Sequence, residues 1–196
     1  MTDTWVIIQA RMESSRLPYK AMLDIQGKPM IQHVIERCQA AGVGNVMVAT
    51  SQCKADLTIK KRCDKLGVST FMGDEDNVLH RFYKAAIRVK AEHVIRVTAD
   101  CPMIDPKIIK DTVGYYWHET PDYCASRMDP NAFPDGMDVE IFTFAALKEA
   151  YEQADPTVLA RFHDACTMVE IAISQVQDVL RADDAQSFDG AVEGQV

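Results

Sequence analysis

Residues 5–20 read Trp-Val-Ile-Ile-Gln-Ala-Arg-Met-Glu-Ser-Ser-Arg-Leu-Pro-Tyr-Lys, an apolar run followed by a polar loop. The run 5–10 predicts a β-strand, because β-branched and aromatic residues dominate it. In an open parallel sheet, ligands bind beyond the carboxyl ends of the strands, so we expect the loop at 11–20 to face a ligand. Its two arginines, one lysine and two serines suit the oxygens of a polyanion. A solvated basic loop explains the same composition, and the Walker phosphate-loop sequence is absent.

Short β-rich runs alternate with segments of helical periodicity along the rest of the chain. This alternation is typical of an α/β domain with a mostly parallel sheet. Pro29 stands where the first residue of a helix would be, and Gly42 stops the apolar pattern that follows it. The further expected strands are 46–50, 68–71, 93–98 and the alternating residues 137–141, and the further expected helices are 56–66, 78–86, 105–119 and 144–154.

The composition is that of a folded globular protein. The chain has 196 residues, 47% hydrophobic and 26% charged, which favours one domain with a sizeable core and excludes a disordered chain. The net charge of −8 opposes broad binding to nucleic acid or to an anionic membrane. No apolar run approaches the roughly 20 residues of a membrane helix and the N-terminus lacks a signal-peptide pattern, so we expect a cytoplasmic protein. The six cysteines form no C-x-x-C pair and are expected to be reduced thiols.

Several ordered motifs between residues 5 and 150 resemble those of one enzyme family. They are Ile8-Gln-Ala-Arg11, the run from Ser14 to Lys20, Gly27-Lys-Pro-Met30, Glu36-Arg37, Val48-Ala-Thr-Ser51, Gly73 to Arg81, Arg96-Val-Thr-Ala-Asp-Cys-Pro102 and Pro134-Asp-Gly-Met-Asp-Val-Glu140. Together they resemble the cytidylyltransferases that make CMP-activated acidic sugars, and most nearly the spore coat polysaccharide branch of that superfamily. The resemblance implies a three-layer, Rossmann-like nucleotidyltransferase fold.

The same resemblance implies a reaction in cell-surface or spore coat polysaccharide biosynthesis. A sugar hydroxyl would attack the α-phosphorus of CTP, and pyrophosphate would leave. The implied partners are CTP and a sugar, the implied cofactor is Mg²⁺, and a homodimer is expected by analogy with the family.

The resemblance also assigns roles to individual residues. Those it places on the nucleotide are Arg11, Ser14, Arg16, Lys20, Thr50, Ser51 and Arg81. The first four would hold the triphosphate and the leaving pyrophosphate, and the last three would lie near the base or ribose. Lys20 or Arg16 would neutralise charge in the transition state. The family commonly has glycine before this lysine and this chain has Tyr19, which leaves the path of the loop backbone open.

Acidic residues follow two of the expected strands. Asp100 comes directly after 93–98, where a carboxylate faces the ligand edge and suits Mg²⁺ bound to phosphate oxygens. The resemblance assigns Asp100 to the metal, although an aspartate after a strand is also a common turn former or helix cap. Asp135, Asp138 and Glu140 form a second cluster, suited to metal or sugar hydroxyls, or to a solvated acidic edge. Strand alternation would put Asp138 and Glu140 on one face.

Residues 1–155 are expected to form the nucleotidyltransferase domain, and 156–196 a divergent or truncated C-terminal segment. Within that segment 160–181 has a helical pattern, whereas 183–196 lacks periodicity and is expected to be a frayed tail. The Glu-His-Val-Thr-Pro and Asp-Thr-Pro-Glu-Asp segments that the family carries later in the chain are not found. Two alternatives therefore stay open: a nucleotide-binding relative with no or impaired turnover, and a nucleotidyltransferase or glycosyltransferase that uses another nucleotide.

Overall fold

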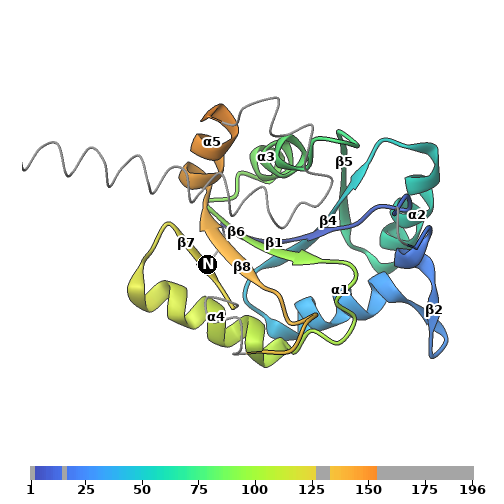
Figure 1. The fold of residues 1–196 in the computed structure, drawn as a ribbon, viewed down its shortest axis with the longest axis horizontal. Coiled ribbons are helices and arrows are strands. Elements are labelled where there is room, and N and C mark those ends of the chain that lie inside the picture. Colours follow the sequence, from blue (N-terminus) through green and yellow to red (C-terminus); the bar gives the residue numbers. More distant parts are fainter. Residues whose placement is uncertain (1–2, 15–16, 127–132, 154–196) are drawn as a thin grey trace, which may run out of the picture.

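A computed structural model describes residues 3–14, 17–126 and 133–153. Its centre is a six-stranded sheet with the order β5-β4-β1-β6-β8-β7 (Figure 1). The first four strands of this order run parallel, and β8 pairs with β6 and with β7 in the antiparallel direction. The strands are β1 (Thr4–Gln9), β4 (Asn45–Ser51), β5 (Ser69–Gly73), β6 (His93–Thr98), β7 (Tyr123–Ala125) and β8 (Glu140–Thr143).

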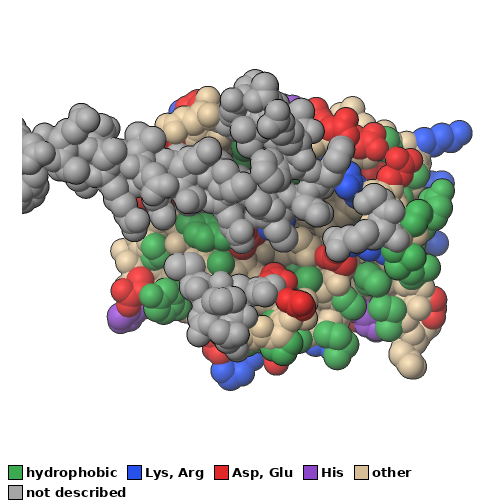
Figure 2. Space-filling model, viewed as in Figure 1, with side chains coloured by type: hydrophobic (Ala, Val, Ile, Leu, Met, Phe, Trp, Pro, Cys, Tyr) green, Lys and Arg blue, Asp and Glu red, His purple; other side chains and the backbone are tan. Residues whose placement is uncertain are grey.

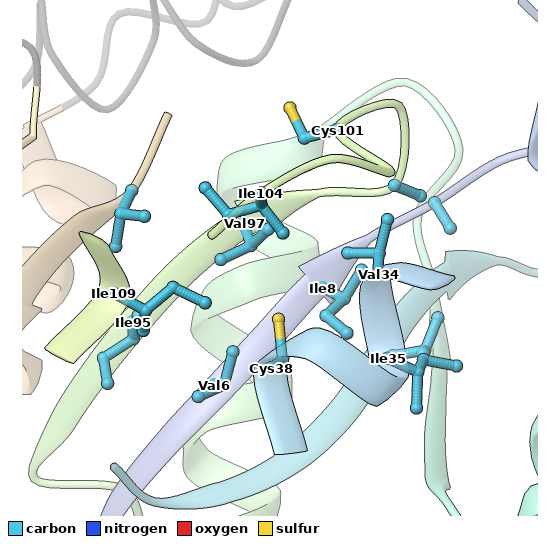
Figure 3. Close-up of a cluster of buried hydrophobic side chains, with 14 of the residues drawn as sticks. Val6, Ile8, Val34, Ile35, Cys38, Ile95, Val97, Cys101, Ile104 and Ile109 are labelled. Carbon is cyan, nitrogen blue, oxygen red and sulfur yellow. The ribbon is translucent and has the colours of Figure 1, made fainter. Parts of the chain in front are cut away.

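Helices cover both faces of the sheet (Figure 1). One face carries α1 (Met30–Ala41), α2 (Leu57–Leu66) and α4 (Pro106–Glu119), and the other carries α3 (Val78–Val89) and α5 (Phe144–Gln153). Strand residues alternate between the two layers: Val6 and Ile8 pack with α1 (Figure 3), and Ile7 packs with α3. This is the three-layer α/β arrangement that the sequence predicted.

Three local details differ from the sequence prediction. Pro29 is not the first residue of α1, because with ψ 144° it is extended and pairs in a short hairpin of β2 (Asp24–Ile25) and β3 (Lys28–Pro29). The alternating residues 137–141 do not form one strand, because β8 begins at Glu140. Strand β7 was not expected, since three residues are too short for a periodic pattern.

Within the described residues, no helix is long and apolar enough to cross a membrane. The five cysteines described are all free thiols. The predicted segment 156–196, its helical pattern at 160–181, and Ser15 and Arg16 lie outside the described residues.

Candidate active site

The carboxyl ends of three parallel strands meet at one edge of the sheet. Gln9 ends β1 and is in register with Thr98, the last residue of β6, and with Ala49 of β4. The pairing continues one residue further, because the N–H of Ala10 donates to the carbonyl of Ala49 at 3.1 Å and the N–H of Ala99 donates to that of Gln9 at 2.9 Å. The loops after these strands therefore begin side by side, and those after β1 and β6 contain the predicted site residues Arg11, Ser14, Lys20 and Asp100.

The loop after β1 is closed by its own backbone. The N–H of Tyr19 donates to the carbonyl of Met12 at 2.7 Å, and the short 3₁₀ helix η1 (Lys20–Met22) follows. Tyr19 has φ 63° and ψ 13°, in the left-handed region. Glycine adopts this conformation without steric cost, whereas a residue with a Cβ is strained there. The chain therefore places a tyrosine in a backbone conformation that favours the family's glycine.

Substitutions at Tyr19 test this strain, because the side chain is 58% exposed and little packing is lost. We expect Tyr19→Gly to raise the free energy of unfolding by about 0.5 kcal/mol, since relief of strain exceeds the entropy that glycine adds to the unfolded chain. Leu17→Gly is the matched control at an exposed loop residue without positive φ, and should lower it by about 0.5 kcal/mol. Urea denaturation measures both, and an equal loss in the two variants would contradict the prediction.

Two predicted site residues, Lys20 and Asp100, are in direct contact. Lys20 Nζ donates to Asp100 Oδ2 at 2.5 Å, across 80 residues of sequence. Burial acts to raise the pKa of Asp100, but hydrogen bonds from Lys20 and Thr98 outweigh it and hold that pKa below its usual value. The site therefore pairs an ionised carboxylate from the loop after β6 with the predicted phosphate-binding lysine.

The carboxylate of Asp100 is the predicted ligand of a magnesium ion. Among the residues that the structure describes, no three His, Cys, Asp or Glu side chains lie close enough together to hold a metal ion. Mg²⁺ keeps several waters and typically uses one or two carboxylates together with phosphate oxygens. A single ionised carboxylate beside the predicted phosphate-binding loop fits this donor requirement.

Arg81 is buried beside Arg11. Its Nη1 donates to the carbonyls of Asp74 at 2.5 Å and Glu75 at 3.2 Å, while its Nε and Nη2 have no hydrogen-bond partner in the described part of the chain. Burial first, and then the charge of Arg11, lower the pKa of Arg81 to about 10, so the side chain stays charged at neutral pH. Figure 2 shows acidic side chains near the β5–α3 connection, to which Asp74 and Glu75 belong. Two buried donors of Arg81 therefore have no partner among the described residues, and a ligand bound beside them would satisfy both.

Thr50 and Ser51 end β4 and are both buried against Asp56. Their hydroxyls donate to Asp56 Oδ2 at 2.9 and 2.5 Å, and the backbone N–H of Ser51 donates to the same oxygen at 2.9 Å. Asp56 Oδ1 accepts the backbone N–H of Met12 at 2.7 Å. The sequence pattern predicted Asp56 only as the beginning of a helix and gave no sign of these contacts. The hydroxyls of Thr50 and Ser51 are thus oriented by a buried carboxylate.

Of the other residues predicted to bind the triphosphate, the structure describes Arg11 and Ser14. Arg11 and Ser14 are half-buried, and Arg11 lies close enough to Arg81 for its charge to lower the pKa of that guanidinium. Arg16 lies outside the described residues, so its catalytic role stays a prediction.

Glu140 is a buried residue of the sheet. It is 5% exposed, accepts a hydrogen bond from Arg96 Nη1 in an ion pair, and accepts another from the hydroxyl of Tyr123 at 3.0 Å. The expectation of a solvated acidic edge is therefore wrong for Glu140. The expectation that it shares a strand face with Asp138 is also wrong, because Asp138 precedes β8.

Asp138 lies near the site instead, beside the residue that follows Asp100. Burial raises the pKa of the Cys101 thiol, a hydrogen bond with Thr98 opposes this rise, and the charges of Asp100 and Asp138 add to it. Both carboxylates therefore lie close enough to act on one buried thiol. Asp135 is exposed in the segment before β8. The structure thus brings Asp138, but not Glu140, to the surroundings of Asp100.

Comparison with known proteins identifies the family. The sequence pattern of the cytidylyltransferase family matches residues 5–180, and the chain belongs to this family, as the resemblance predicted. The spore coat polysaccharide biosynthesis protein SpsF of Bacillus subtilis is 28% identical over 185 residues, which is 87% of this chain and 75% of SpsF. The 3-deoxy-manno-octulosonate cytidylyltransferase of Idiomarina loihiensis is 41% identical over 110 residues, which is 54% of this chain and 42% of that enzyme.

Solved structures agree with the fold. A cytidylyltransferase from Leptospira borgpetersenii superposes with a TM-score of 0.74 at 28% identity, over 79% of this chain and 66% of the other. The predicted nucleotidyltransferase fold is therefore confirmed. The chain spans less than half of the length of the octulosonate enzyme that it matches.

Proposed function

We propose that this chain is a magnesium-dependent cytidylyltransferase that transfers CMP from CTP to a hydroxyl of an acidic sugar and releases pyrophosphate. The contact between Lys20 and Asp100 is the observation on which the proposal rests. It joins a cation from the loop after β1 to an ionised carboxylate after β6, at the sheet edge where such folds bind ligands. Family membership supports CTP, and the names of two relatives support an acidic sugar and polysaccharide synthesis.

The proposed reaction needs positioning and charge neutralisation more than covalent help from the protein. The acceptor oxygen forms a bond to the α-phosphorus, the bond to the bridging oxygen of pyrophosphate breaks, and the hydroxyl proton passes to solvent. Lys20 and Arg11 would neutralise the triphosphate and the charge that develops on pyrophosphate. Arg81 would turn its two unpartnered N–H groups to the nucleotide. Asp100 would hold Mg²⁺, which supplies further neutralisation of phosphate charge when bound.

Pyrophosphate release tests the proposal. The purified chain is incubated with CTP, Mg²⁺ and a panel of sugar acids that includes 3-deoxy-manno-octulosonate, and ATP, GTP and UTP replace CTP in parallel. We expect release with CTP and at least one sugar acid. Calorimetric titration separates the alternatives, because CTP binding without release with any acceptor would favour a non-catalytic relative. Release with ATP, GTP or UTP instead would identify a different nucleotide substrate. The absence of both CTP binding and pyrophosphate release would overturn the proposal.

A further inference from the structure

Asp56 is the most completely hydrogen-bonded carboxylate near the site, and the proposed reaction does not use it. The side chain is 1% exposed and accepts four hydrogen bonds. Oδ1 accepts the N–H of Met12, and Oδ2 accepts the hydroxyl of Thr50 together with the N–H and hydroxyl of Ser51. Two of the four donors are backbone N–H groups, which can only donate.

The position of Asp56 beside a helix does not account for these contacts. Asp56 ends the 3₁₀ turn η2 (Lys54–Asp56) directly before α2, and its φ of −72° and ψ of −12° are helical rather than the values of a capping residue. Its side chain caps no helical N–H and reaches instead to Met12 after β1 and to Thr50 and Ser51 at the end of β4. The carboxylate therefore binds the loop after β1 and the end of β4 rather than its own helix.

The contacts of Asp56 lead directly to the phosphate loop. Met12, whose N–H binds Asp56, also accepts the N–H of Tyr19 at 2.7 Å and so closes the loop immediately before Lys20. The negative charge of Asp56 also lies near enough to Arg81 to raise the pKa of that buried guanidinium. One carboxylate thus ties the loop after β1 to the end of β4 and offsets a buried cation.

We propose that Asp56 is a positioning residue for triphosphate binding, which fixes Met12 and, through it, Tyr19 and Lys20 in the binding geometry. This inference rests on the proposed function. Asp56 acts through the backbone of Met12 and does not itself touch the nucleotide. Its negative charge excludes direct contact with phosphate oxygens.

An asparagine at position 56 has the size of the aspartate but cannot accept all four of its hydrogen bonds. If the amide nitrogen takes the place of Oδ1, it faces the N–H of Met12, and if it takes the place of Oδ2, it faces the N–H of Ser51. In either orientation, a buried backbone donor meets another donor and loses its acceptor. Asp56→Asn therefore releases either the loop or the end of β4, and it removes the charge beside Arg81.

Calorimetric titration with CTP and Mg²⁺ tests the proposal. We expect Asp56→Asn to weaken CTP binding by about tenfold, the effect of losing one hydrogen bond to a charged acceptor. The matched control is Asp64→Asn on α2, whose carboxylate is exposed and pairs with Lys60 at 2.7 Å. This control should bind CTP like the wild type. Equal binding by the wild type and Asp56→Asn would overturn the inference alone.

A double-variant cycle with Lys20→Ala separates positioning from a general loss of stability. If Asp56 acts through the loop, the effect of Asp56→Asn on CTP binding should shrink in the Lys20→Ala background. Purely additive effects would overturn the inference. If Asp56→Asn does not fold, the same cycle is run with Asp56→Glu, which keeps the charge but displaces both oxygens by one methylene. No CTP binding by the wild type would overturn the proposed function and this inference with it.

Discussion

Lys20→Ala should slow pyrophosphate release from CTP by about 100-fold or more, because in the proposed reaction Lys20 neutralises phosphate charge in the transition state. It should leave the free energy of unfolding nearly unchanged. The pair with Asp100 is partly exposed, and such pairs contribute only about 0–1 kcal/mol. The measurements are the initial rate of release at saturating CTP and acceptor, and a urea unfolding curve. A large loss of rate with little loss of stability is the expected signature of a catalytic cation.

The chain offers a matched control for this variant. Lys107 pairs with Asp111 at the same 2.5 Å distance, but both side chains are exposed on α4. Lys107→Ala therefore removes a lysine–aspartate pair of equal length that lies within one helix, and we expect a wild-type rate. An equal rate in Lys20→Ala and Lys107→Ala would contradict a catalytic role for Lys20.

Elements with a local periodic signal were predicted well from the sequence. α1 spans Met30–Ala41 and ends at Gly42 in the left-handed conformation, as the apolar spacing and the glycine predicted. β1 and β6 are long enough for an apolar run to show, and each was located within one residue. β3 and β7 are two and three residues long, so no periodicity could reveal them.

Contacts at the site could not be predicted in the same way, because they join residues that are distant in sequence. Motifs located Lys20 and Asp100 separately, but their contact depends on the meeting of β1 and β6. The hydrogen bond from Met12 to Asp56 spans 44 residues, and no motif marked Asp56 as more than a helix start. Asp56 differs from an ordinary helix start because its side chain is buried. This burial follows from the packing of α2 on the sheet, which local residue spacing does not reveal.

Glu140 is a charged residue whose contacts likewise could not be predicted from the sequence. Its position in an acidic cluster favoured ligand binding or solvent exposure, whereas the strand register places it opposite Arg96 of β6. Arg96 is 2% exposed, and its guanidinium also donates to Gln9 Oε1 at 3.3 and 3.4 Å and lies 5.9 Å from the ring centre of Phe82. A buried cation held in this way needs a countercharge, and Glu140 supplies it.

Glu140→Leu should therefore lower the free energy of unfolding by about 3–5 kcal/mol, because it removes the carboxylate that pairs with the buried charge of Arg96. Urea denaturation measures the loss. Glu152→Leu is the control on the exposed surface of α5, where the side chain is 57% exposed, and its effect should stay within about 0.5 kcal/mol.

The double variant Arg96→Met with Glu140→Leu decides whether charge is the cause. Removal of both charges leaves no unpaired ion in the sheet, so we expect the double variant to recover most of the stability lost in Glu140→Leu. A double variant as unstable as the sum of the single variants would contradict this account. If Glu140→Leu instead keeps wild-type stability but raises the KM for the acceptor sugar, Glu140 binds substrate, because a purely structural carboxylate would change stability first.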